Sequence, residues 1–174
     1  EVEAARERVR GQALAMEVGS EIRGIAKAIR VEYERLGYNV PEVEIGVSEP
    51  ELSDSVDAPI KIWRSSGYFD SDDPPLVGSF PEISQQIKEA KCFTNDGSWI
   101  WKDLERRLRG LGLTARQARS RLSNLPEKLY DNMVPIGVHF GGISFFTDQP
   151  FTEADFATAR RFGEVFGVAY RRHL

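Results

Sequence analysis

The sequence predicts an α+β fold in which helices at both ends of the chain pack on one antiparallel sheet. Three observations indicate this class. Apolar residues recur at steps of three and four in residues 1–37 and again in residues 152–174, as they do along one face of a helix. Between these segments apolar and polar residues alternate, which is typical of half-buried strands. Gly141 and Gly142 separate the last two alternating runs and favour a hairpin there. Helices set apart from antiparallel strands along the chain favour α+β.

Length and composition indicate one structural domain. The chain has 174 residues, of which 41% are hydrophobic and 29% are charged, so it is large enough to bury a core. No run approaches the roughly 18 apolar residues that a membrane-spanning helix needs, and we expect no membrane insertion. The single cysteine, Cys92, excludes an internal disulfide. It favours a reducing compartment, and we expect a cytoplasmic protein.

Residues 1–37 are predicted to form two helices or one kinked helix. The first runs from Glu1 to about Val18. Ser20 is suited to cap the second, which Gly37 ends. The first helix carries a heptad-like apolar seam, which we expect to face a partner. The seam consists of Val2, Ala5, Val9 and Met16.

Residues 38–151 are predicted to hold the sheet with inserted helices. One inserted helix is expected from Pro81 to Ala90, a second from Ser98 to Gly110, and a third from Thr114 to Asn124. The alternating runs that we assign to strands are VEIGV, IKIWRSS, LVGSF, KCFTND and the hairpin pair MVPIGVHF and GISFFTD.

The C-terminal helix is predicted over residues 152–174. Thr152 and Asp155 have the spacing of a capping box. No Gly or Pro follows Tyr170, so we expect the helix to continue beyond the given sequence, and because Glu1 is not a methionine we expect an earlier natural start. The apolar seam of this helix includes Phe162, Phe166, Ala169 and Tyr170.

Both ends of the chain resemble a known family. The segments RGQALAMEVGSEIRGIAKAIRVEYERLG and HFGGISFFTDQPFTEADFATARRFGEVFGVAYRRHL, about 65 residues together, are similar to the terminal helices and last hairpin of GAF-like sensor domains in bacterial signalling proteins. The middle of the chain matches only loosely. The resemblance implies a sheet of about six antiparallel strands. It also implies a small-molecule pocket on one sheet face, with the terminal helices on the other face and loops or short helices over the pocket.

The resemblance also implies a mode of action. Such a domain is a non-catalytic sensor of a two-component or related signal-transduction protein. It forms a homodimer through its N-terminal and C-terminal helices and passes a helix rearrangement to a covalently linked output domain, such as a histidine kinase or a nucleotide cyclase. The seams of residues 1–37 and 152–174 independently favour a parallel four-helix arrangement of two chains. The same residues would alternatively pack on their own sheet.

Aromatic residues cluster in the segments that would surround the implied pocket. Rings of this kind suit a cavity for a flat ligand, although tryptophans in a domain are first of all core residues. Trp63 is the one expected nearest the pocket face, and His139 is also interpretable as a structural histidine. The candidate pocket residues are Trp63, Phe93, Trp99, Trp101, His139 and Phe140. The Cys-His pair of tetrapyrrole-binding members and the NKFDE run of cyclic-nucleotide-binding members are absent, so the ligand is unknown and no cofactor is expected.

The charge distribution leaves a second function open. Residues 42–73 hold nine acids, whereas residues 102–128 hold eight basic residues. The basic stretch is either a solvated helix face or a nucleic-acid contact. Within residues 103–125, LTARQARSRLSNL can be drawn as the second helix of a helix-turn-helix, with Arg116, Arg119 and Arg121 towards phosphates. A DNA-binding regulator is therefore the alternative hypothesis.

Most enzyme classes lack their residues in this chain. With His139, His173 and one cysteine, a zinc site of His and Cys ligands cannot be assembled. The acids Asp70, Asp72 and Asp73 lack the glycine and distal glutamate of a calcium loop, and no phosphate-binding glycine loop follows a strand. A nucleophilic pair of Cys92 and His139 has no support from spacing. We therefore expect this domain not to be an enzyme.

Overall fold

The computed structural model describes residues 1–15, 22–48, 55–65, 75–136 and 141–172. Within these ranges the chain forms six helices and six strands. The helices are α1 (Val2–Leu14), α2 (Ile22–Arg35), α3 (Pro81–Lys88), α4 (Trp99–Gly110), α5 (Ala115–Arg121) and α6 (Glu153–Arg171). The strands are β1 (Glu42–Val47), β2 (Pro59–Arg64), β3 (Leu76–Ser79), β4 (Phe93–Asp96), β5 (Tyr130–Pro135) and β6 (Gly141–Thr147).

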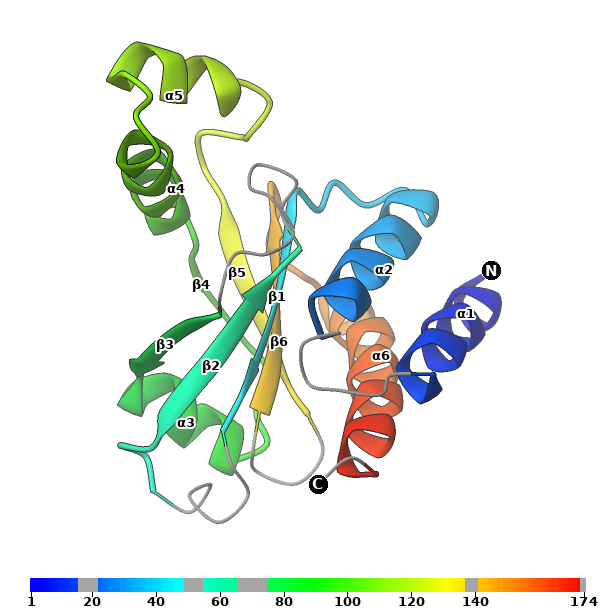
Figure 1. The fold of residues 1–174 in the computed structure, drawn as a ribbon. Coiled ribbons are helices and arrows are strands. Elements are labelled where there is room, and N and C mark those ends of the chain that lie inside the picture. Colours follow the sequence, from blue (N-terminus) through cyan, green and yellow to red (C-terminus); the bar gives the residue numbers. More distant parts are fainter. Residues whose placement is uncertain (16–21, 49–54, 66–74, 137–140, 173–174) are drawn as a thin grey trace.

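The strands form one open antiparallel sheet in the order β3-β2-β1-β6-β5-β4. The first and last strands of the chain, β1 and β6, therefore lie side by side at its centre (Figure 1). The prediction of an α+β fold with about six antiparallel strands is confirmed.

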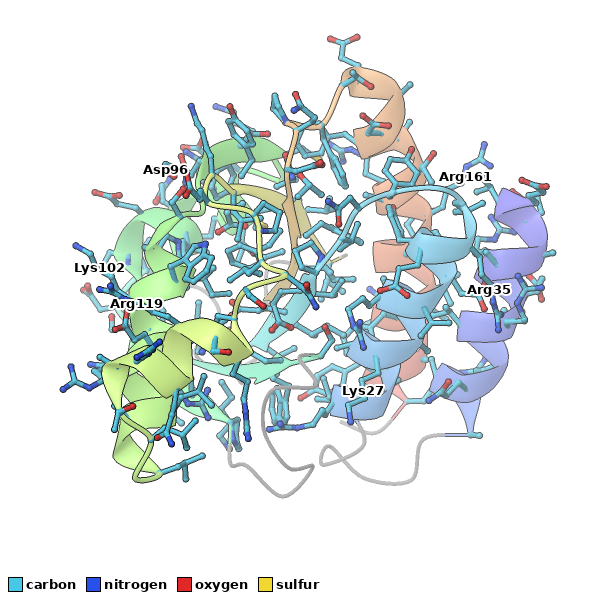
Figure 2. The ribbon with its side chains drawn as sticks, turned by 90° about the horizontal axis from the view of Figure 1, so that it is seen from above. Lys27, Arg35, Asp96, Lys102, Arg119 and Arg161 are labelled. Carbon is cyan, nitrogen blue, oxygen red and sulfur yellow. The ribbon has the colours of Figure 1, made fainter. Side chains whose placement is uncertain are left out.

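The helices at the two ends of the chain lie on one face of this sheet (Figure 1). α2 packs on β1 and β2, and α6 packs on β5. α1 packs outside them, against α6 and α2, and runs in the same direction as α6 (Figure 1). An ion pair joins α1 and α6, with Arg161 Nη1 2.8 Å from Glu3 Oε1. Figure 2 labels Arg161 on α6. The N-terminal and C-terminal helices are therefore neighbours, as the sequence predicted.

An aromatic cluster fills the space between these helices and the sheet. Tyr33 of α2 lies at its centre, with ring centroids 4.7 Å from Phe145 of β6 and 5.2 Å from Phe162 of α6. Phe151, just before α6, packs 5.5 Å from both Phe145 and Phe156. Rings at these separations bury large apolar areas in favourable tilted geometries. This cluster therefore fixes α2 and α6 on the sheet.

The apolar seams of the terminal helices are internal to one chain. Five of the predicted seam residues are fully or almost fully buried, namely Ala5, Val9, Phe162, Phe166 and Ala169. Val2 is half-buried, and Tyr170 is half-buried and stacks on Phe166 at 5.5 Å; Met16 lies outside the described residues. The expectation that these side chains face a second chain is corrected here, because each helix has one apolar stripe and that stripe is covered by the chain's own core.

Two helices, α5 and α6, begin with the predicted capping boxes. Thr152 and Asp155 form a reciprocal capping box at the start of α6, and Thr114 and Gln117 form another at α5. Each box satisfies backbone N–H groups that have no partner within the first turn.

The other side of the sheet carries α3, α4 and α5. α3 packs on β5 and β6. α4 and α5 form a helical pair beside the sheet (Figure 1). Their small apolar core comprises Ile100, Leu104, Leu108, Ala118, Leu122, Leu125 and Leu129, with Phe146 of β6. The short helices thus lie on the side of the sheet opposite the terminal helices.

Candidate functional site

Two glycines make the centre of the sheet shallow on the α3 side. Gly46 of β1 and Gly142 of β6 are directly opposed in the strand register. A Cβ at Gly46 would lie 3.1 Å from Ile60 Cγ2, and one at Gly142 would lie 2.7 Å from Met133 Sδ. The missing side chains leave a hollow over the two central strands.

The hollow is part of a cavity of about 90 Å³ between the sheet and α3. Its wall is mainly apolar, and Trp99 at the start of α4 also lines it. The apolar residues include Ile60, Ile62, Phe80, Ile83, Ile87 and Met133. Its polar lining side chains are Glu44, Asp131 and Ser144. An apolar wall with a few converging polar groups is typical of a small-molecule site.

Asp131 is the polar residue of this cavity that is least satisfied. It is 7% exposed, and its Oδ1 atom has no hydrogen-bond partner among the described residues. Burial, and then the neighbouring Glu44, raise the pKa of this carboxyl to about 7, while the nearby Ser144 hydroxyl opposes the rise. A buried oxygen without a donor costs free energy. Asp131 is therefore a group to which a ligand can bind.

The lining residue Glu44 belongs to a buried ion network. Arg64 of β2 is 4% exposed, and its Nε donates to Glu44 Oε1 at 2.5 Å. Its Nη1 donates to Asp103 of α4, which also accepts from Arg106 at 2.7 Å. Burial raises the pKa of Glu44, while Arg64 opposes that rise. Two nitrogens of the Arg64 guanidinium thus bind carboxylates and tie the sheet to α4, while its buried Nη2 has no partner among the described residues.

A second charge lies behind this network. Arg107 of α4 is close enough to Glu44 and Glu42 for their charges to raise its pKa, but burial and the charges of Arg64 and Arg23 outweigh them and lower it. The charge of Arg107 therefore acts on Glu44 and Glu42. The ionisable groups that line the cavity itself are carboxyl groups.

The structure brings together only part of the predicted pocket set. Trp99 lines the cavity. Phe93 is paired with the lining residue Met133 on the neighbouring strand, but Phe93 itself does not line the cavity. Trp101 lies against the α4–α5 core, where its Nε1 donates to the Pro126 carbonyl at 2.6 Å. His139 and Phe140 lie outside the described residues.

The expectation for Trp63 was wrong. Side chains alternate along a strand, so Ile60 and Ile62 share a face with Arg64, whereas Trp63 points to the other face. It packs in the core with the terminal helices. Because Trp63 directly follows Ile62, the alternation of the strand places it on the face opposite the pocket, whereas we expected it near the pocket from the sequence.

The polar residues of the cavity escaped the sequence reasoning. Glu44 and Gly46 alternate with the apolar residues of VEIGV, so they read as the solvent face of a half-buried strand. In the structure β1 lies between two other strands. Helices lie on both faces of the sheet, so the face that carries Glu44 and Gly46 is covered as well.

Other reactive groups do not form a site in the described ranges. No group of three or more His, Cys, Asp and Glu side chains there is placed to hold a metal ion. Cys92 is half-buried, and burial raises the pKa of its thiol, which disfavours the reactive thiolate. Of the helices described, none is long and apolar enough to cross a membrane.

Neither of two comparisons with known proteins identifies the chain: no protein-family model matches it, and no curated protein is significantly similar to it.

Proposed function

We propose that this chain is a non-catalytic sensory domain that binds a small molecule in the cavity and transmits the change to α1 and α6. The observation that carries the proposal is the cavity itself, on the face of the sheet opposite the terminal helices, where the lining residue Asp131 has a buried carboxyl oxygen without a partner among the described residues. The resemblance of both chain ends to GAF-like sensor domains supports the same interpretation. The output domain would be joined to a terminal helix.

The two faces of the sheet are coupled through single strands. Met133 lines the cavity, and the next residue, Val134, points to the helix face and belongs to the helix-side core. α6 lies directly on this part of β5: a Cβ at Gly163 would be 3.4 Å from the Pro135 carbonyl oxygen and 3.6 Å from Val134 Cγ1. A ligand that binds one arrangement of β5 more tightly therefore also biases the position of α6.

A fragment screen by thermal shift tests the binding step. The fragments are amines, alcohols, carboxylic acids and heterocycles of up to about ten non-hydrogen atoms, matched to a small cavity. We expect at least one chemical class to raise Tm. Gly46→Ala should weaken that effect, because its Cβ enters the cavity 3.1 Å from Ile60 Cγ2. Gly110→Ala is the control, since nothing lies within 4 Å of that Cβ. If no class of fragment stabilises the protein, the proposed function is refuted.

We further propose a homodimer that uses the outer groove between α1 and α6. The buried seam is unavailable, but Leu14 and Val168 are 40% and 48% exposed and line this groove. The groove also carries both signs of charge, from Arg6, Glu7, Arg10, Glu164 and Arg172. A two-fold contact between identical grooves can therefore pair opposite charges around an apolar centre.

Light scattering at several protein concentrations tests the dimer. We expect a two-chain mass for the wild type and a one-chain mass for Val168→Glu. Leu111→Glu is the control, because Leu111 is also exposed but lies after α4, far along the chain from the groove. A single-chain mass for the wild type at high concentration would rule out this dimer.

The alternative function, DNA binding, has one structural feature in its favour. α4 and α5 form a helical pair, and most of their basic residues are exposed (Figure 2 shows Lys102 and Arg119 there). The exposed set is Lys102, Arg106, Arg109, Arg116, Arg119 and Arg121.

We expect a DNA-binding protein to show duplex affinity that falls between about 50 and about 200 mM salt, measured by fluorescence anisotropy. Arg119→Ala should weaken it and Arg171→Ala, on α6, should not; absence of binding at low salt removes this alternative.

A further inference from the structure

We infer that the cavity selects a small organic cation, whose charged N–H group contacts Asp131 and whose short apolar body packs against the isoleucines of β2 and α3. The inference rests on the proposed function and names its ligand class. An alkylammonium, amidinium or guanidinium group has the required donors.

The first step is the unmet hydrogen bond. Asp131 lines the cavity, and its buried Oδ1 has no donor within the described part of the chain. No described side chain forms an ion pair with Asp131. A charged donor from a ligand would satisfy this oxygen, and hydrogen bonds between ionised partners are about twice as strong as neutral ones.

The second step is the sign of the charge. Glu44 and Asp131 both line the cavity, whereas no described lining residue is Lys, Arg or His. Arg64 does not line the cavity; its Nε and Nη1 donate to Glu44 and Asp103, and its buried Nη2 has no partner among the described residues. A phosphate or carboxylate ligand would be desolvated next to two carboxyl groups, with no cationic side chain among the described lining residues to receive it. Anions are therefore disfavoured, and nucleotides with them.

The third step is size and polarity. The cavity volume is about 90 Å³, well below the roughly 300–1,000 Å³ of sites for drug-sized molecules. Ile60 and Ile62 from β2 and Ile83 and Ile87 from α3 form much of its wall. The ligand is therefore a compact molecule with one charged end and a short branched or cyclic apolar end.

The surrounding charges give the binding a pH dependence. Glu44 faces Asp131 from β1 and Ser144 faces it from β6, while Arg64 of β2, with Asp103 and Arg107 of α4, act through Glu44. No lining residue of α3 is charged. Because the pKa of Asp131 is about 7, its ionised fraction rises about tenfold from pH 6 to pH 8. An alkylamine stays protonated over this range, so its affinity should rise by the same factor.

Three probes of one shape test the inference by calorimetry. They are isopentylamine, isopentyl alcohol and 4-methylpentanoate, each titrated at pH 6, 7 and 8. We expect the amine to bind tightest, with affinity that rises about tenfold from pH 6 to pH 8, since the Asp131 pKa is about 7. Asp131→Asn should remove both the preference and the pH dependence. Asp57→Asn is the matched control, because Asp57 is exposed and, among the described residues, only its backbone groups are hydrogen-bonded.

The outcomes separate this inference from the proposed function. Equal binding of amine and alcohol, tighter binding of the carboxylate, or no binding of any of the three probes overturns the cation inference. The cavity proposal survives such a result if another fragment class raises Tm and Gly46→Ala suppresses the effect. If Asp131→Asn does not fold, titration of the three probes into the wild type at pH 6, 7 and 8 is still a complete test of the inference.

Discussion

Replacing Asp131 by asparagine should change the pH dependence of stability in a defined direction. The folded-state pKa of this carboxyl is about 7, against about 3.9 in an unfolded chain. Between these values the folded state holds a proton that the unfolded state has released. Stability contributed by the protonated form is therefore fully present below about pH 4 and is lost as the pH rises towards 7.

The size of this effect follows from linkage. Each pH unit over which one extra proton is held by the folded state changes the free energy of unfolding by about 1.4 kcal/mol. From pH 5 to pH 8, a carboxyl with a pKa of about 7 therefore lowers the free energy of unfolding by about 2–3 kcal/mol. Asparagine does not titrate, so the difference in unfolding free energy between Asp131→Asn and wild type should shift by that amount in favour of the variant.

Urea unfolding of both proteins at pH 5, 6, 7 and 8, followed by circular dichroism, measures this difference. Any constant effect of the asparagine on packing cancels, because only the change of the difference with pH is used. Asp57→Asn should stay parallel to wild type at every pH, since Asp57 is exposed. Parallel curves for Asp131→Asn and wild type would refute the reasoning that Asp131 is buried with a raised pKa.

Three further predictions concern stability. Thr152→Ala removes the capping box of α6 and should cost about 1 kcal/mol in urea unfolding; an unchanged midpoint would contradict the role of the cap. Leu108→Ala leaves a cavity in the α4–α5 core and should cost about 2–5 kcal/mol, whereas Leu111→Ala, at a position 67% exposed, should stay within about 0.5 kcal/mol. The hydrogen bond from Arg8 lowers the pKa of Glu32, so Glu32→Gln should be less stable than wild type at pH 7, with a difference that shrinks as the pH falls below about 4; a difference independent of pH would contradict that interaction.

Local sequence patterns were sufficient to predict the helices and strands. They were insufficient to predict what each helix or strand packs against. The capping pairs at Thr114 and Thr152 and the alternation in VEIGV depend on residues a few positions apart, and the structure has them as predicted. Whether a stripe faces its own sheet or another chain depends on contacts distant in sequence. Val9 and Phe166 show this, because their spacing suits either partner and the chain's own core covers both.

The cavity was beyond such reasoning for a related reason. Glu44 and Asp131 are far apart in sequence and meet only because β1, β6 and β5 are neighbours in the sheet. A charged residue on an alternating strand usually faces water. Its burial here depends on α3 and the start of α4, which lie against a sheet face whose other side is already covered by α2 and α6. The order of strands and layers, which no short pattern encodes, therefore creates the candidate site.

Ionisation of Asp131 lowers the stability of the free protein and raises its affinity for a cation, so the two effects are thermodynamically linked. At pH 8 the free protein holds an ionised carboxyl in an apolar cavity, because the pH lies above its pKa of about 7. A cation that pairs with it recovers part of that cost, so the same ligand should stabilise the protein more at pH 8 than at pH 6. With ligand in excess at both pH values, a tenfold gain in affinity adds about 1.4 kcal/mol to the stabilisation. A neutral ligand in the same cavity would give equal stabilisation at the two pH values, and the comparison thus distinguishes a site that recognises charge from an apolar void that any small molecule fills.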